Sequence, residues 1–250
     1  MRVLRPAAVV LRGLRRRRRG EPVLVNVDLS VPVGARLLLV SEPEGAASVL
    51  LRVLAGLARP SAGEYQLAGM RRADASGQGW ARRVAYVGPT PTMYRWLTPR
   101  EVLLLSARLT GLETDEASQR VVALLAQFRL VAEADRPLGR TGSVVTQKTA
   151  LAAALVSDPE ILLLDDPLRS VEPGERSRLL RLRGRRTVLL ASRYPAGEAG
   201  LVNQVALLCD GRVVLHAAVA DLEAHGLPLS VRGIKALGEL APRTRVAATA

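Results

Sequence analysis

Short, continuous apolar runs recur along the chain, each followed by a turn or a helical stretch. Such runs are typical of strands buried on both faces, because helices cover both faces of a parallel sheet. They are far shorter than the roughly 20 residues that a membrane-spanning helix needs. The pattern predicts a largely parallel sheet in a mixed α/β protein. The clearest runs lie at residues 37–40, 161–166, 187–192 and 205–214.

The segments outside these runs predict a β-rich opening and a helical middle. Residues 7–11 and 23–31 have the β-branched content of strands. A helical pattern follows over residues 48–60, and a further strand is expected at residues 65–69. In the middle of the chain, Leu, Val and Ala at helical spacing predict helices at residues 101–112, 116–131 and 149–156.

Arginine dominates the charge of the chain. Its 250 residues include 36 basic and 23 acidic side chains, a net charge of +13. This balance favours nucleic acid, acidic headgroups or an acidic partner subunit, and it does not choose among them. A coding bias toward Arg, Ala, Leu and Val, or a solvated face, would give the same composition. The basic residues that stand out are the run Arg15–Arg19 and Arg181, Arg183, Arg185 and Arg186.

The N-terminal segment lacks the order of a secretory signal. Its apolar stretch, Ala7–Leu11, is brief and precedes a stronger basic run. Cys209 is the single cysteine, so it forms no internal disulfide and supplies no metal cluster. We therefore expect a cytoplasmic protein in which Cys209 packs as a small apolar residue.

Five segments between residues 7 and 222 resemble the ABC-transporter ATPase family in their order and spacing. The opening strands read VLVNVDLSVPVGARLLLV, and the helix and strand after the phosphate loop read LLRVLAGLARPSAGEYQLAG. The segments similar to the family's glutamine loop, Walker B strand and closing hairpin read VAYVGPTPTMYRWLTPREVLLLSARLTGL, LVSDPEILLLDDP and LLCDGRVV. The resemblance lies in the framework more than in the chemistry.

The resemblance implies a P-loop NTPase-like ABC ATPase core. Such a core has a mostly parallel sheet flanked by helices, a β-rich N-terminal subdomain and a helical subdomain. We expect one ABC ATPase-like domain over residues 1–225, with its helical subdomain at about 90–157. Residues 226–250 would then form a C-terminal extension.

The segment at the position of the phosphate loop has lost most of the groups that such a loop needs. A working loop uses glycines to expose its backbone N–H groups, a lysine for the phosphate charge and a hydroxyl for Mg²⁺. By resemblance, Ser41, Glu44 and Ala46 take the glycine positions and Ala47 the lysine position, whereas Ser48 keeps the hydroxyl. The whole vestigial site comprises Ser41, Glu42, Pro43, Glu44, Gly45, Ala46, Ala47, Ser48 and Val49.

The glutamates of this segment oppose phosphate binding directly. A carboxylate about 5 Å from a phosphate repels it by about 3 kcal/mol per unit charge at an effective dielectric constant of about 20. Losing the lysine as well would weaken binding by several powers of ten. Two interpretations stay open, a solvated surface turn and a site that now takes another ligand.

Walker B is the best preserved chemical element. Asp165 stands at the Mg²⁺-orienting position, and Asp166 stands where the family has its catalytic glutamate. Asp is one methylene shorter than Glu, and general-base geometry tolerates displacements of no more than about 1 Å. The alternative for Asp166 is an ordinary turn carboxylate at a strand end. In the loop that follows, Glu172 replaces the usual aspartate.

Several other nucleotide-handling positions are substituted. Arg18 falls where an aromatic residue stacks on adenine, Pro89 where a glutamine senses the γ-phosphate, and Arg193 where the switch histidine stands. The signature segment, TGSVV, keeps only Gly142 and Ser143. Its branched valines would block close approach of the backbone to a phosphate.

These substitutions favour a degenerate ATP-binding subunit, a structural or regulatory component of a membrane transport complex that hydrolyses ATP poorly or not at all. One alternative is a subunit that still binds ATP and hydrolyses it slowly through Ser48, Asp165 and Asp166. Another is a basic protein that binds nucleic acid or anionic lipid, although only 3% of the residues are aromatic and could stack on bases.

The resemblance also implies partners. Family active sites combine the phosphate loop of one subunit with the signature of another, so both a homodimer and a heterodimer with a competent ATPase are considered. The remaining partner is an ABC membrane subunit, docked near residues 89–105, which would hold the chain peripherally at the inner face of the cell membrane. No cofactor is firmly expected; ATP, with Mg²⁺ held by Ser48 and Asp165, belongs to the enzyme alternative.

Overall fold

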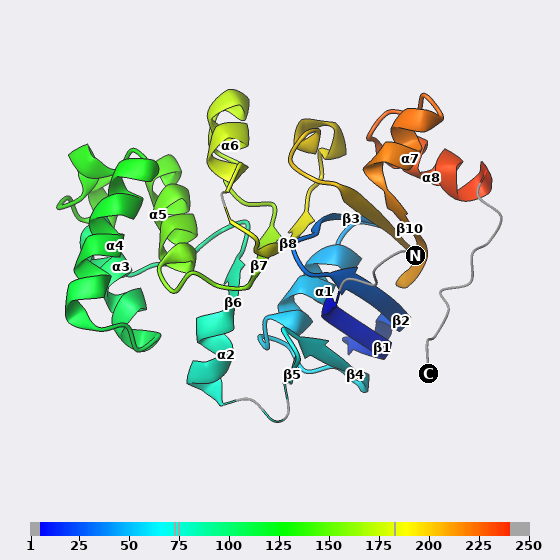
Figure 1. Cartoon of the computed structure of the whole chain (residues 1–250), viewed down its shortest axis with the longest axis horizontal. Coiled ribbons are helices and arrows are strands. Elements are labelled where there is room, and N and C mark those ends of the chain that lie inside the picture. The colour runs from blue at the N-terminus through cyan, green and yellow to red at the C-terminus, as the bar shows by residue number, and fades with distance from the viewer. Residues whose placement is uncertain (1–5, 73, 75, 183, 241–250) are drawn as a thin grey trace. The chain divides into compact units, whose positions relative to one another are not determined.

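The computed structural model describes residues 6–72, 74, 76–182 and 184–240. Arg183 and the last ten residues of the expected C-terminal extension therefore lie outside the described residues. The chain forms two compact units (Figure 1). The first unit combines residues 1–74 with residues 184–250, and the second unit comprises residues 75–183.

An antiparallel sheet opens the first unit. Its strands are β1 (Ala7–Arg18), β2 (Glu21–Pro32), β4 (Ala62–Leu67) and β5 (Met70–Arg71), in the order β2-β1-β4-β5. The expected strand at residues 7–11 is too short, because β1 continues through the arginine run. Arg16, Arg17 and Arg18 pair with Leu24, Pro22 and Glu21 of β2. Charge does not end the strand, since Arg17 and Arg18 keep their side chains in solvent at the end of the hairpin.

Four more strands of the first unit carry the short apolar runs. They are β3 (Arg36–Glu42), β8 (Thr187–Ala191), β9 (Gln204–Cys209) and β10 (Arg212–Ala218). β3 pairs in parallel with both β8 and β9, and β10 pairs antiparallel with β9. Helix α1 (Ala46–Leu54) contacts β2 of the antiparallel sheet as well as β3 and β8. The first unit also contains the 3₁₀ turn η3 (Pro195–Glu198), α7 (Val219–Ala224) and α8 (Val231–Leu240).

The second unit has two parallel strands and a group of helices. β6 (Val84–Val87) pairs with β7 (Ile161–Asp165), with Val84 opposite Ile161. The three longest helices, α3 (Pro99–Leu109), α4 (Thr114–Gln127) and α5 (Ser143–Leu155), contact one another. Thr98 and Glu101 form a capping box that begins α3, as expected for a Thr followed three residues later by Glu. The shorter elements are α2 (Gly77–Arg83), α6 (Pro173–Leu180), η1 (Val131–Glu133) and η2 (Leu138–Arg140).

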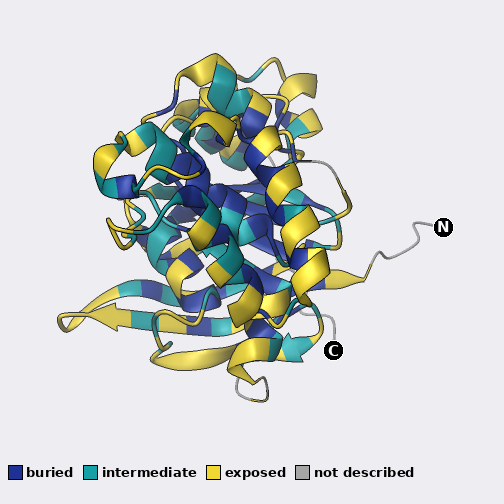
Figure 2. Cartoon of the chain, turned by 90° about the vertical axis from the view of Figure 1, so that its left-hand side faces the viewer, coloured by how far each residue is buried: buried dark blue, intermediate teal, exposed yellow. Residues whose placement is uncertain are grey.

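The structure confirms the predicted mixed α/β architecture with parallel strands, a β-rich N-terminal sheet and a group of helices. Buried residues collect in the interior, and exposed residues lie on the outer faces of helices and at strand ends (Figure 2). Several helix boundaries are wrong. α5 begins at Ser143, six residues before the expected start at residue 149, whereas α1 ends at Leu54 and α4 at Gln127, before their expected ends at residues 60 and 131. Within the described residues, no helix has the length and apolar character that crossing a membrane requires.

Candidate functional site

The phosphate-loop segment has the framework of such a loop without its side chains. β3 ends at Glu42, a turn covers residues 43–45, and α1 begins at Ala46. The helix starts with a hydrogen bond from Val49 N to Gly45 O of 3.0 Å. The chain therefore makes a short strand, turn and helix at the predicted place, with the helix N-terminus following the turn.

No residue of this segment, residues 41–49, carries a positive charge. Glu42, Pro43 and Glu44 are exposed, whereas Ala47, at the lysine position, is buried with 5% of its surface accessible. Ala46 is also buried, and Ser41, Ser48 and Val49 are partly exposed. Within the described residues, Glu44 forms no ion pair. The exposure of Glu44 fits the solvated-turn interpretation.

Glu42 has a partner that the sequence did not indicate. Its carboxylate forms an ion pair with Lys235 of α8, and its backbone oxygen accepts a hydrogen bond of 3.0 Å from Asp210 N. The hydrogen bond to Glu42 raises the pKa of Lys235 above its ordinary value. Lys235 is thus a cation beside the segment, but it already forms an ion pair with Glu42.

Two substituted positions of the first unit lie on its surface. Arg18 is exposed at the last position of β1, and Arg193 is exposed just after β8. Arg18 thus lies at the end of a strand, and Arg193 lies two residues beyond the end of one.

The two Walker B aspartates lie in the second unit, at the end of β7. Asp165 and Asp166 are buried, with 3% and 8% of their surfaces accessible. The Tyr86 hydroxyl of β6 donates a hydrogen bond to Asp165 Oδ2 at 3.0 Å. Asp166 has a φ of 45°, in the left-handed region that Asp tolerates better than most residues. This backbone conformation fits the interpretation of Asp166 as a turn residue, and the catalytic interpretation stays open.

The segment after β7 is tied to α5 by two contacts that sequence reasoning missed. Gln147 Nε2 donates to Ser170 Oγ at 3.1 Å, and Ser170 N donates to Gln147 Oε1 at 2.9 Å. Lys148 Nζ lies 2.8 Å from Glu175 Oε1, and this contact lowers the pKa of Glu175. The sequence offered one signal for these contacts, the adjacent polar residues Gln147 and Lys148. Their burial is seen only in the structure.

Glu172 has a structural role in this segment. Its carboxylate caps α6 by accepting hydrogen bonds of 3.0 Å from Gly174 N and from Glu175 N. These bonds lower the pKa of Glu172, because they stabilise its charged form. The glutamate in place of the usual aspartate therefore acts as a helix cap.

The remnant of the signature motif lies at the start of α5. Gly142 is the N-cap and Ser143 the first helical residue, and both are exposed. Val144 and Val145 are partly exposed in the first turn. The first turn of this helix therefore carries two branched side chains, as the sequence indicates.

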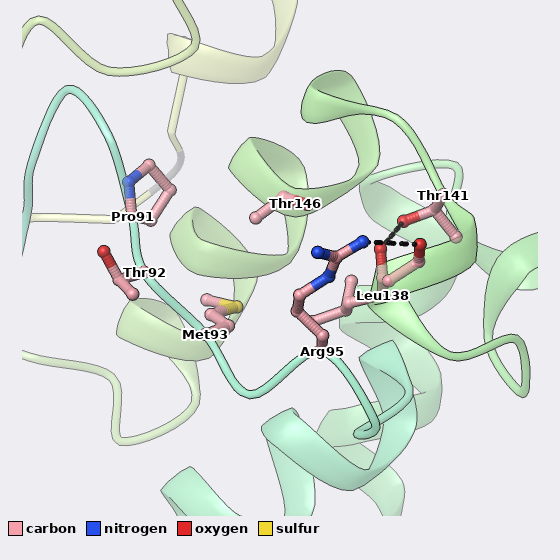
Figure 3. Close-up of a pocket in the computed structure, with 8 residues that line it drawn as sticks. Pro91, Thr92, Met93, Arg95, Leu138, Thr141 and Thr146 are labelled. Atoms are coloured by element: carbon pink, nitrogen blue, oxygen red, sulfur yellow. Dashed lines mark hydrogen bonds between the residues drawn. The ribbon is translucent and has the colours of Figure 1, made fainter.

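Pro89 follows β6 and leads into the segment that lines a pocket of about 290 Å³ (Figure 3). Arg95 and Gly139 join its two sides, since Gly139 N donates to Arg95 O at 2.7 Å and Arg95 Nη2 donates to Gly139 O at 3.4 Å. A Cβ at position 139 would lie 2.9 Å from Arg95 O, so the close approach needs glycine. The lining residues are Pro91, Thr92, Met93, Arg95, Leu138, Gly139, Thr141 and Thr146.

Two exposed aromatic residues lie on either side of Arg95 in this segment. Tyr94 and Trp96 expose 61% and 70% of their surfaces, and their rings stack with centroids 4.8 Å apart. Large apolar side chains held together in solvent are typical of protein interaction sites. Within the described residues, no group of three or more His, Cys, Asp or Glu side chains is placed to hold a metal ion.

Comparison with known proteins gives a consistent family assignment. A family model described as ABC transporter matches residues 24–169. The chain is 31% identical over 226 residues to the aliphatic sulfonates import ATP-binding protein SsuB of Corynebacterium glutamicum, and the alignment covers 88% of this chain and 86% of that protein.

Two solved structures share the fold. One is described as the ATP-binding subunit of an ABC transporter; it superposes with a TM-score of 0.80 at 24% identity and covers 92% of this chain and 99% of that one. The other is a dimeric, post-hydrolysis ATP-binding cassette bound to ADP and Pi, with a TM-score of 0.75 at 19% identity and coverage of 84% and 98%.

Proposed function

Because the chain belongs to the ABC-transporter ATP-binding family, we propose that it is a structural or regulatory subunit of a membrane transport complex that hydrolyses ATP poorly or not at all. One observation carries this proposal. The segment in the position of the phosphate loop presents exposed Glu42 and Glu44 and a buried Ala47, and it offers no lysine to a triphosphate.

These residues do not fit ATP with Mg²⁺. Phosphate groups need N–H donors and cations at short range, and exposed carboxylates beside them are repulsive. Lys235 is the cation beside the loop, and it is already paired with Glu42. The donor set of this segment therefore argues against a bound triphosphate, and we derive no hydrolytic step through one.

The alternative, a subunit that still binds and slowly hydrolyses ATP, has support from the second unit. Asp165 and Asp166 remain buried at the end of β7, and Tyr86 orients Asp165. Buried carboxylates are costly to keep without a role. In a heterodimer, a competent partner ATPase would supply an intact signature opposite this chain's loop and an intact loop opposite this chain's signature. The alternative is therefore tested with the partner present as well.

Repair of the phosphate loop tests the proposal. The variant Ser41→Gly/Glu44→Gly/Ala46→Gly/Ala47→Lys restores the backbone donors and the cation. We expect MgATP to raise its melting temperature, because ligand at about 100 times its Kd adds about 2.7 kcal/mol of stability. Each protein is compared with its own melting temperature without nucleotide. An equal shift in the unrepaired chain would contradict the loss of nucleotide binding.

The exposed aromatic pair offers a docking position for a membrane subunit. ATP-binding subunits of this family work with membrane subunits and dimerise, and docking was expected near residues 89–105. The pocket segment with Tyr94 and Trp96 lies within that range. We place a membrane-subunit segment with an apolar face at this surface, which holds the chain peripherally at the membrane.

Trp96→Ala is expected to release the chain from native membranes. Removal of a central aromatic contact typically costs about 2 kcal/mol or more of binding free energy, or at least about a tenfold loss in affinity. The measurement is the fraction of tagged protein that sediments with membranes of its own cells. Tyr194→Ala removes an aromatic residue that is 72% exposed elsewhere in the chain and should have no effect. Equal losses in both variants would overturn the docking position.

A further inference from the structure

Three arginines surround a pocket in the first unit. The pocket has a volume of about 440 Å³, which falls within the range of small-molecule sites. Strands β1 and β2 and the beginning of β4 form it, and Arg212 of β10 contributes from the adjacent hairpin. These elements all belong to one compact unit, so the pocket is complete within it.

The charged residues that line this pocket are all arginines. Arg15, Arg17 and Arg212 line it, together with the polar residues Asn26 and Ser61, and the other lining residues are apolar. None of the described residues that line it is acidic. Within the described part of the chain, none of the three guanidinium groups forms an ion pair with a carboxylate. Guanidinium groups that share one cavity repel one another, and a bound anion would relieve that repulsion.

Hydrogen bonds hold two of the polar groups in place. Arg15 Nη2 donates to Asn26 Oδ1 at 3.3 Å, which orients the guanidinium at the pocket. Ser61 Oγ accepts a hydrogen bond of 3.1 Å from Arg17 N, and its own proton remains available to a ligand. A planar guanidinium with several N–H donors matches the oxygens of a phosphate group.

The pocket is separate from the positions that the family uses for nucleotide. Arg18, which aligns with the adenine-stacking residue, is not among the lining residues. Arg16, between Arg15 and Arg17, donates to Arg59 O and so has a structural contact. Within the arginine run, Arg16 therefore contacts the turn after α1, whereas Arg15 and Arg17 line the pocket.

We propose that this pocket binds a phosphate-bearing anion of small-molecule size through Arg15, Arg17 and Arg212. This site goes beyond the proposed function and does not depend on it. Two sources share the required chemistry, a soluble phosphorylated compound and the headgroup of an anionic phospholipid. The apolar lining residues, which include the buried Leu24, suit an uncharged portion of either ligand.

Calorimetric titration with inorganic pyrophosphate, without Mg²⁺, tests the soluble source. Arg17→Gln/Arg212→Gln removes two pocket arginines whose side chains form no hydrogen bond within the described residues. Arg52→Gln/Arg232→Gln removes the same charge from exposed positions of the same unit. We expect the pocket variant to bind at least about tenfold more weakly than the unaltered chain, because each lost charge-assisted hydrogen bond to the phosphate weakens binding by about that factor. The control variant should change by less than about threefold.

Sedimentation with vesicles of phosphatidylglycerol in phosphatidylcholine tests the headgroup source in the same three proteins. A larger loss in the pocket variant than in the control, with either probe, supports the proposal and identifies the source. Equal losses in both variants would show that net charge alone attracts the anion and would overturn the proposal, as would no binding of either probe. Unchanged melting temperatures establish that the variants remain folded.

Discussion

Glu175→Gln is expected to lower the free energy of unfolding by about 2 kcal/mol. Its partner, Lys148, exposes 9% of its side chain and lies 2.8 Å from Glu175 Oε1, so the substitution leaves a nearly buried cation without its counter-charge. Breaking a fully buried pair costs about 3–5 kcal/mol, and the partial exposure of Glu175 reduces that figure. Urea unfolding of the two proteins at neutral pH measures the difference.

The same substitution should change the dependence of stability on pH. Lys148 holds the pKa of Glu175 below its ordinary value of 4.5. The stabilisation is therefore present above that value and is lost as the pH falls through the lowered folded-state pKa. The difference between the two proteins should shrink below about pH 4.5. Glu133→Gln, which removes an exposed pair with Arg136, should cost less than about 1 kcal/mol. Equal costs would contradict a special role for the Lys148 pair.

Gly211→Ala is expected to destabilise the protein by about 3 kcal/mol. Asp210 and Gly211 have φ angles of 47° and 72° and make the two-residue turn of the β9–β10 hairpin. A Cβ at position 211 would lie 2.4 Å from Val23 O, while Gly211 O accepts a hydrogen bond from Val25 N at 2.8 Å. The new methyl group therefore adds a clash with a backbone atom to the cost of the left-handed conformation.

Gly226→Ala separates these two costs. Gly226 also has a positive φ, 64°, but a Cβ there would meet no atom within 4 Å. This variant should lose only about 1 kcal/mol, the cost of the left-handed backbone. Thermal or urea unfolding of both variants gives the comparison, and equal losses would mean that contact with Val23 contributes nothing.

Most strands were predictable from local sequence because their apolar runs are buried, although the last run reaches Val214, which is 56% exposed on β10. Residues 161–165 and 187–191 are buried at every position, as the continuous runs predicted. The length of β1 was not predictable, since its continuation depends on pairing with β2 and not on the side chains of the arginine run. The start of α5 was missed because Val144 and Val145 are branched, and packing in the second unit overrides their weaker helix preference.

The parts of the candidate site that are formed by residues adjacent in sequence were predictable. The strand, turn and helix around Glu44 follow from residues next to one another, and the structure has them. The Glu42–Lys235 and Lys148–Glu175 pairs join distant segments, and no single-sequence pattern indicates which charges will meet. The roles of Gly142, Ser143, Pro89 and Arg193 toward a nucleotide stay predictions.

Titration of the unaltered chain with ATP and Mg²⁺ to millimolar concentration, followed by melting temperature, tests the central claim most directly. A ligand that binds only the folded state raises stability by RT ln(1 + [L]/Kd), so absence of binding gives no shift. We predict no shift, because Glu42, Glu44 and the buried Ala47 offer no site for a triphosphate. A clear Mg²⁺-dependent rise in melting temperature would contradict the claim and favour an ATP-binding subunit that uses Ser48, Asp165 and Asp166.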